Sequence, residues 1–228
     1  VGVGIGLQLL TQLPQRVRLE DPAPVDLGQV VLAPDVVDGA QDPFRRVAGA
    51  VLADEARKNG VIYSMAWGDQ PAEIVDMVDW ARTAGFEVVC AGKGTRFQPE
   101  YHQSTPDTIW GYYGITAEHA AKSHMRAQMF NSFLDGTKSA IEMAAVSTAT
   151  RLLPPEDGLH FPPCGTDDLP RILKPKANGG LLDHSGMVEV IASEERDGRP
   201  VFKDLRFGIY VTLHGDSPYM MDCYKEYG

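Results

Sequence analysis

Cysteine, positive charge and long apolar runs are all scarce in this sequence of 228 residues. Its three cysteines form no CxxC pair, which is typical of reduced thiols in a reducing compartment and provides no zinc motif. The net charge of −10 leaves no overall basic face, so nucleic acid is not an expected partner. No segment reaches the roughly 18 apolar residues that a membrane span needs. We therefore expect a cytoplasmic protein with neither a membrane nor a nucleic-acid partner.

The middle of the chain alternates between helical apolar spacing and short β-rich runs. Helices are predicted over residues 47–60 and 71–85, and a glycine closes each of them. Each helix is followed by a predicted strand, over residues 61–67 and 86–92. This rhythm predicts an α/β fold.

The C-terminal part of the chain alternates apolar and polar residues in two runs, at 187–193 and 205–213. The turn sequence Asp-Gly-Arg-Pro at 197–200 separates them. This pattern predicts a β-hairpin or meander that packs on the α/β part.

The N-terminal residues resemble half of a mononucleotide-binding unit. Gly2, Gly4 and Gly6 give GxGxG in place of the GxGxxG fingerprint, and Glu20 follows at about the spacing of a ribose-binding carboxylate. The alternative is a glycine-rich buried strand with a polar end. We expect residues 1–66 to be the remnant of a Rossmann-type NAD(P)-binding domain, with parts of that domain missing from the sequence. Residues 67–228 are expected to form an α+β substrate-binding, catalytic and dimerisation domain.

Two strand-to-helix turns carry polar residues of the kind that α/β enzymes place in their ligand crevice. Asp69 stands at the N-cap of a predicted helix, and capping alone is the alternative role. Lys93 lies between two glycines at the expected end of a strand, where an ammonium group can hold a phosphate or polarise a carbonyl. A solvent-exposed turn lysine is the alternative.

A third candidate is the segment 130–149, which we expect to be a catalytic helix that begins near Asp135. Lys138 and Glu142 are spaced i and i+4, so they share one face of that helix, and Asp135 precedes them closely enough to join them. An exposed ion pair, worth only a few tenths of a kcal/mol, is the alternative. The small apolar residues around the pair favour burial, where charges are costly without a purpose.

Five segments occur together in one order: GDQP at 68–71, VVCAGKGT at 88–95, FNSFLDGTKSAIEMAAV at 130–146, GLHFPP at 158–163 and GMVEVIASEERDGRPVF at 186–202. In this order they resemble the homoserine-dehydrogenase-like oxidoreductases that carry a C-terminal SAF domain. Within that group the chain is similar to the 1-deoxy-D-xylulose-5-phosphate reductoisomerase-like enzymes. The resemblance covers residues 47–228 and ends before the place where a SAF domain would begin.

The resemblance implies NADPH as cofactor, Mg²⁺ or Mn²⁺ as a candidate second cofactor, a phosphorylated sugar as substrate and a homodimer. Homoserine dehydrogenases carry an acidic residue and then a lysine four positions later on the matching helix, whereas here Lys138 precedes Glu142. That reversal keeps a charged pair but argues against the homoserine reaction itself. The expected activity is reductive isomerisation of 1-deoxy-D-xylulose 5-phosphate to 2-C-methyl-D-erythritol 4-phosphate, a step of isoprenoid biosynthesis.

The expected site residues fall into three groups. The expected catalytic residues are Lys93, Asp135, Lys138 and Glu142. Cofactor binding is expected at Gly4, Gly6, Glu20 and Gly68. Substrate binding is expected at Asp69, Gln70, Thr95, Asn131 and Thr137. Asp69, Asp135 and Glu142 are also candidates for a base or for metal ligands, although the six histidines show no HxxxH or HExxH pattern.

Two other functions stay open at this point. One is a dehydrogenase of another hydroxy acid, aldehyde or branched sugar on the same scaffold. The other is a non-catalytic ligand-binding module, which the incomplete GxGxG would suit.

Overall fold

The computed structural model describes residue 51, residues 54–61 and residues 68–227. The predictions for Gly4, Gly6 and Glu20, and for most of the strand at 61–67, lie outside the described residues. Within the first described segment, residues 54–59 are helical and Gly60 has a φ of 67°, so the predicted helix end at this glycine is confirmed.

Helix α3 (Gln70–Thr83) is the predicted amphipathic helix, and its ends follow the predicted signals. The Asp69 carboxylate accepts a hydrogen bond from the Gln70 backbone N–H, and Pro71 occupies the first turn. Gly85, with a φ of 88°, follows the end of the helix and turns the chain toward the next strand. Ile74, Val78 and Ala81 are buried along one face of α3.

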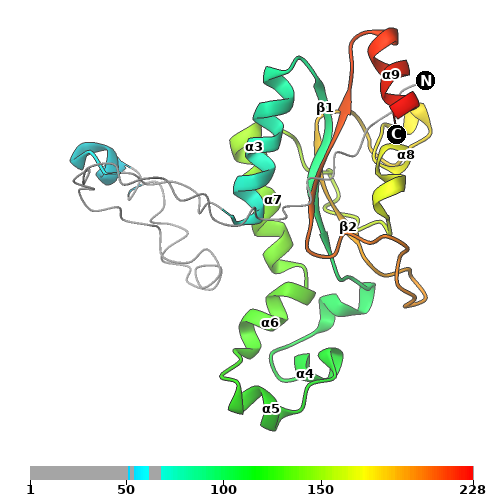
Figure 1. The fold of residues 1–228 in the computed structure, drawn as a ribbon. Coiled ribbons are helices and arrows are strands. Elements are labelled where there is room, and N and C mark those ends of the chain that lie inside the picture. The colour runs from blue at the N-terminus through cyan, green and yellow to red at the C-terminus, as the bar shows by residue number, and fades with distance from the viewer. Residues whose placement is uncertain (1–50, 52–53, 62–67, 228) are drawn as a thin grey trace, which may run out of the picture. The chain divides into compact units, whose positions relative to one another are not determined.

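Strand β1 (Glu87–Thr95) is the centre of a three-stranded sheet in the order β2–β1–β3. It pairs in parallel with β2 (Met187–Ala192) and antiparallel with β3 (Ile209–His214), as Figure 1 shows. The predicted β-hairpin is therefore wrong, because its two strands lie on opposite sides of β1 and do not pair with each other. The predicted mixed α/β class is confirmed, while the incomplete Rossmann domain stays a prediction.

Helices cover one face of this sheet, and short helices with loops cover the other (Figure 1). On the first face lie α3 and α7 (Thr137–Thr150), which pack on the sheet through a core that includes Ile74, Val146 and Val188. On the second face α8 (Leu169–Ile172) and its flanking loops bury Cys90, Leu173 and Tyr210. A central strand covered on both faces explains why Val88 through Gly94 are all buried.

The remaining elements extend from the ends of the sheet. Four short helices lie in the connection that leaves β1: a 3₁₀ helix Pro99–Gln103, α4 (Ile109–Tyr113), α5 (Ala117–Lys122) and α6 (Ala127–Leu134). The later connection holds the 3₁₀ helices Thr166–Asp168 and Lys176–Asn178, and α9 (Pro218–Tyr227) follows β3. Among the described residues, no helix combines the length and the apolar character that crossing a bilayer requires.

The helix start predicted near Asp135 is confirmed, because α7 begins at Thr137, while the earlier residues of the segment 130–149 belong to a separate helix, α6. Asp135 ends α6, and Gly136 adopts a φ of 90° between the two helices. That left-handed conformation interrupts the helical hydrogen bonds and is available to glycine at little cost. The break turns α7 so that its first turn lies beside the carboxyl end of β1 (Figure 1).

The Gly92–Lys93–Gly94 segment lies inside β1, and the prediction that it forms a turn is wrong. A Cβ on Gly92 would lie 1.8 Å from the Glu189 carbonyl oxygen, and one on Gly94 would lie 1.7 Å from the Leu205 carbonyl oxygen. The two glycines therefore allow the backbone of neighbouring segments to pack closely against β1. The sequence had suggested that they allow a ligand to approach.

Replacing Gly92 with alanine should destabilise the fold by at least the ~1–3 kcal/mol typical of overpacking, because a backbone carbonyl cannot rotate aside as a side chain can. Urea unfolding measures the loss. Gly111→Ala is the matched control, since Gly111 is helical and a Cβ there would meet no atom within 4 Å. Equal stability of the two variants would contradict the proposed close packing.

Candidate active site

A pocket of about 330 Å³ opens at the carboxyl end of β1, the end where α/β proteins bind their ligands. The first turn of α7, the end of α6 and the loop that precedes β3 complete its walls. Its lining residues come from six segments of the chain: Gln70, Lys93, Gly94, Thr95, Arg96, Tyr113, Phe130, Phe133, Lys138, Ser139, Arg206 and Phe207. This lining contains four cationic side chains and no carboxylate, in a protein whose net charge is −10.

Lys93, Glu142 and Lys138 form a hydrogen-bonded array at the base of the pocket. The Lys93 ammonium donates to Oε2 of Glu142, and the Lys138 ammonium donates to Oε1 of the same carboxylate. Lys93 is 4% exposed and Glu142 is 2% exposed, whereas the Lys138 side chain is partly open to the pocket. The predicted pairing on one face of α7 is confirmed, and the alternative of an exposed ion pair is wrong.

Gln70 fixes the position of Lys93 from the other side. Its Oε1 accepts a hydrogen bond of 2.9 Å from Lys93 Nζ, and its Nε2 donates to the Phe207 carbonyl oxygen at 3.2 Å. The Gln70 amide thus joins the amino end of α3, the central strand and the loop before β3. Both ends of this amide bind protein groups, so Gln70 holds Lys93 and the loop in place beside the pocket.

Burial lowers the pKa of the Lys93 ammonium, since a charged amine is disfavoured away from water. The Glu142 carboxylate opposes this effect, while the positive charge of Lys138 adds to it. A lysine with a lowered pKa can release and take up a proton closer to neutral pH than a free lysine can. This is the property that a general acid or base needs.

The other predicted site residues lie around the pocket at different depths. Thr95 lines the pocket, and Asp69 caps α3 close enough to act on the charge of Lys93. Thr137 and Gly68 are exposed at helix starts, and neither lines the pocket.

Asp135 does not join the Lys138–Glu142 pair as predicted. Its carboxylate accepts one hydrogen bond from the Asn131 amide at 2.8 Å and another from the Thr137 backbone N–H at 2.8 Å. Asn131 is itself buried, and its Oδ1 has no partner among the described residues. Asp135 and Asn131 therefore join α6 to α7 behind the pocket wall.

The carboxylates do not fit a divalent metal site. Both oxygens of Glu142 are taken by lysines, and Asp69 and Asp135 are hydrogen-bonded at separate helix ends. Mg²⁺ and Mn²⁺ prefer several oxygen ligands around one point. In the part of the chain that the structure describes, no three acidic, histidine or cysteine side chains gather as such a set.

Sequence reasoning missed several residues that form the pocket walls. Arg96 follows directly after β1, Ser139 follows Lys138, and Arg206 lies in the loop before β3. Arg96 was within reach of prediction because it extends the Gly-Lys-Gly-Thr run. Arg206 was not, because it lies more than a hundred residues from Lys93 in a loop without periodicity.

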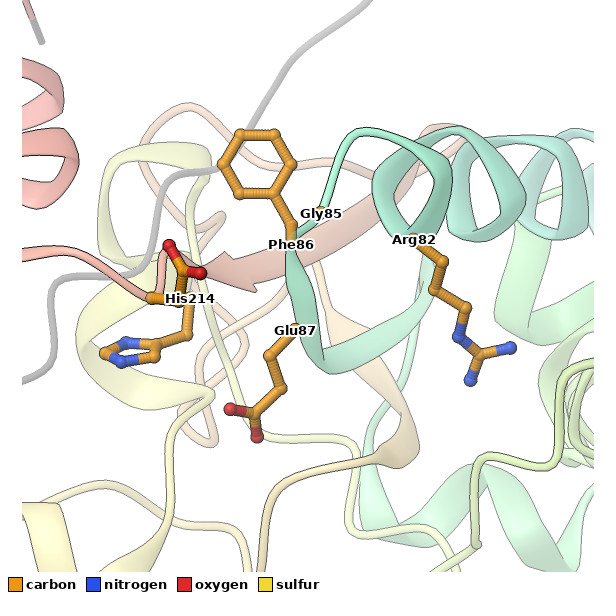
Figure 2. Close-up of a pocket in the computed structure, with 6 residues that line it drawn as sticks. Arg82, Gly85, Phe86, Glu87 and His214 are labelled. Carbon is orange, nitrogen blue, oxygen red and sulfur yellow. The ribbon is translucent and has the colours of Figure 1, made fainter.

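A second hollow of about 350 Å³ lies at the amino end of β1 and is lined by Arg82, Gly85, Phe86, Glu87, His214 and Asp216. Figure 2 shows the Glu87 carboxylate and the His214 imidazole on one side, with Arg82 projecting away from them. It contains none of the predicted site residues and has no buried ionisable array. The pocket at the carboxyl end of β1 is therefore the candidate active site.

One known protein family matches the part of the chain that contains both hollows. The family described as "Oxidoreductase DRL, catalytic domain" matches residues 68–228, which is more than half of the chain. The match includes every residue that lines the candidate active site. Comparison with curated proteins gives no match.

Proposed function

The chain belongs to the oxidoreductase DRL family, and on that premise we propose that it reduces a carbonyl carbon of a small phosphorylated substrate with NADPH. The observation that carries the proposal is the buried Lys93–Glu142–Lys138 array at the base of a cationic pocket. NADPH, when bound, supplies the hydride. The aromatic wall formed by Phe130, Phe133 and Phe207 offers an apolar surface of the kind that suits a planar nicotinamide ring.

Lys93 is the proposed proton donor. As hydride reaches the carbonyl carbon, negative charge develops on the carbonyl oxygen, and the Lys93 ammonium transfers a proton to that oxygen. The product is an alcohol, and Lys93 is left as a neutral amine that regains its proton from water. Its lowered pKa makes both the loss and the gain of the proton accessible.

Glu142 and Lys138 support this transfer. Glu142 keeps Lys93 charged and directed into the pocket, because the carboxylate is hydrogen-bonded to the ammonium and balances its charge. Lys138 lines the pocket beside Ser139, where its ammonium can stabilise the developing oxyanion or hold a second substrate oxygen.

For the substrate we propose 1-deoxy-D-xylulose 5-phosphate, converted to 2-C-methyl-D-erythritol 4-phosphate. Rearrangement of this α-hydroxyketone before reduction needs a base for a hydroxyl proton and positive charge on two neighbouring oxygens. Once the Lys93 ammonium has given its proton to the ketone oxygen, the neutral amine can accept the hydroxyl proton, and Lys138 supplies further positive charge to the pocket. No step uses a divalent metal, because the carboxylates do not form a metal site.

The same arrangement favours a second candidate function, a simple dehydrogenase of another hydroxy acid or aldehyde. Hydride transfer alone needs one proton donor, which Lys93 can supply. We also propose that the protein forms a homodimer, as the sequence resemblance implies, whichever function is correct. Sedimentation analysis measures its oligomeric state.

An NADPH oxidation assay distinguishes these functions. The full-length protein is incubated with NADPH and either 1-deoxy-D-xylulose 5-phosphate or aspartate semialdehyde, and the Glu142→Gln variant is run beside it. Oxidation with the first compound alone supports reductive isomerisation, and oxidation with the second supports the simple dehydrogenase. Absence of any NADPH binding would reject both functions in favour of a non-catalytic ligand-binding module.

A further inference from the structure

We infer that Arg206 is a specificity-determining residue, which binds a phosphate group of the substrate at the outer end of the pocket. The inference rests on the proposed function, because it takes this pocket to be the substrate site. It adds a residue that the sequence did not single out, and it explains why this pocket is cationic in an acidic protein.

The cationic side chains that line the pocket differ in whether a carboxylate neutralises them. Glu142 hydrogen-bonds both Lys93 and Lys138, and Glu194 hydrogen-bonds Arg96 through its Nε at 2.6 Å. Arg206 has no ion pair with any residue in the described part of the chain. The pocket therefore keeps an excess of positive charge after the neighbouring carboxylates of Glu142 and Glu194 are counted. A phosphate monoester carries about −1.5 to −2 charges at pH 7 and would balance that excess.

The position of Arg206 suits recognition of an anion. Lys93 is at the buried base of the pocket, whereas Arg206 is exposed on its rim. The Asp204 side chain accepts a hydrogen bond of 3.0 Å from the Arg206 backbone N–H, which fixes the loop without using the guanidinium. The guanidinium carbon lies 5.1 Å from the centroid of the Phe207 ring, so an apolar face supports it. Its planar N–H groups remain available for a bidentate contact with phosphate oxygens.

Tyr113 and Arg96 line the same pocket, and Tyr113 is close enough to both arginines to be affected by their charges. Burial raises the pKa of the Tyr113 phenol, although the charges of Arg206 and Arg96 oppose the effect, so the hydroxyl stays protonated and can donate a hydrogen bond. Arg96 is held by Glu194, the Tyr101 hydroxyl and the Tyr112 carbonyl oxygen. It therefore contributes fixed positive charge to the pocket, while Arg206 is the cation free to reach the ligand.

Steady-state kinetics with a matched pair of substrates test the assignment. The full-length protein is assayed with 1-deoxy-D-xylulose 5-phosphate and with the same sugar lacking the phosphate. Arg206→Gln should raise KM for the phosphorylated sugar about 10- to 100-fold, the effect of losing a charge-assisted contact, and should change kcat little. It should affect the rate with the unphosphorylated sugar much less than the rate with the phosphorylated sugar, and Arg206→Lys should restore part of the affinity for the phosphorylated sugar.

Lys203→Gln is the control, because Lys203 is an exposed cation of the same loop that pairs with Asp167 and does not line the pocket. A direct binding measurement separates this inference from the proposed function. Calorimetry with inorganic phosphate should detect binding to the wild type, weaker binding to Tyr113→Phe and the weakest binding to Arg206→Gln, whether or not either sugar is turned over.

Three results would overturn the assignment. The first is that the wild type does not bind inorganic phosphate, and the second is that Arg206→Gln binds it as tightly as the wild type does. The third is that Arg206→Gln weakens NADPH binding and leaves KM for the sugar phosphate unchanged, because the phosphate at Arg206 would then belong to the cofactor. Failure of both sugars to react, with phosphate binding that depends on Arg206, would reject the proposed reaction and retain the anion subsite.

Discussion

Replacing Lys93 with methionine is expected to lower kcat by about 10²- to 10⁴-fold, the usual contribution of a general acid or base. Methionine is an unbranched side chain of similar size without the ammonium group, so it still fills the base of the pocket. The affinity for NADPH, measured by fluorescence titration, should stay close to that of the wild type, because Lys93 acts on the substrate oxygen.

Lys122→Met serves as the control for this experiment. Lys122 is an exposed lysine on α5, paired with Glu118, and its loss should leave turnover unchanged. Circular dichroism shows whether each variant is folded before it is assayed. Wild-type turnover in a folded Lys93→Met variant would remove Lys93 from the mechanism.

Replacing Glu142 with glutamine is expected to destabilise the protein by about 3–5 kcal/mol, the typical cost of breaking a buried ion pair by removing one partner. Glu142 is 2% exposed and is the carboxylate that balances both Lys93 and Lys138. Without it, two ammonium groups face each other with little water between them. Urea unfolding of the wild type and the variant measures the loss.

A surface pair with the same spacing provides the control. Glu118 and Lys122 are also i and i+4 on a helix, but both side chains are more than 70% exposed. Glu118→Gln should therefore cost at most ~1 kcal/mol. The double variant Lys93→Met/Glu142→Gln should be more stable than the sum of its single changes predicts. Each single change leaves the charge of its partner buried and unbalanced, and the double change removes both charges. Strict additivity would show that the two groups do not interact.

The local parts of this structure could be predicted from the sequence. The N-cap at Asp69 depends on the residues next to it, and the shared face of Lys138 and Glu142 follows from helical spacing alone. The existence of a strand that begins near residue 86 likewise follows from the apolar run that precedes Gly92. Each of these features needs information from only a few neighbouring positions.

The long-range parts could not be predicted, because no spacing rule reports them. The contact between Lys93 and Glu142 joins residues that are 49 positions apart. Because of it, Lys93 lies at the base of a pocket and not in the turn that the sequence suggested. The alternation that predicted strands near 190 and 210 shows which residues face the core, but not which strand lies beside which. As a result, neither the position of β1 between these two strands nor the position of Arg206 at the site could be predicted from the sequence.

Lys93, held by Glu142, is the proposed proton donor of the reaction, and the pH dependence of kcat/KM reports its protonation state. Burial lowers the Lys93 pKa and Glu142 raises it, so the alkaline limit of activity should depend on Glu142. Because a proton donor must be protonated, kcat/KM for reduction should fall as the pH rises through this lowered pKa, and the reverse oxidation should accelerate over the same range.

The decisive measurement is therefore the profile of kcat/KM against pH for the wild type and for Glu142→Gln. As the pH rises, the kcat/KM of the wild type should begin to fall at a pH lower than about 10.4, the pH at which an ordinary lysine titrates. In Glu142→Gln the decline should occur at lower pH still, because the carboxylate that favours the charged amine is gone. An alkaline limit at the same pH in both proteins would show that Glu142 does not control the protonation of the proton donor.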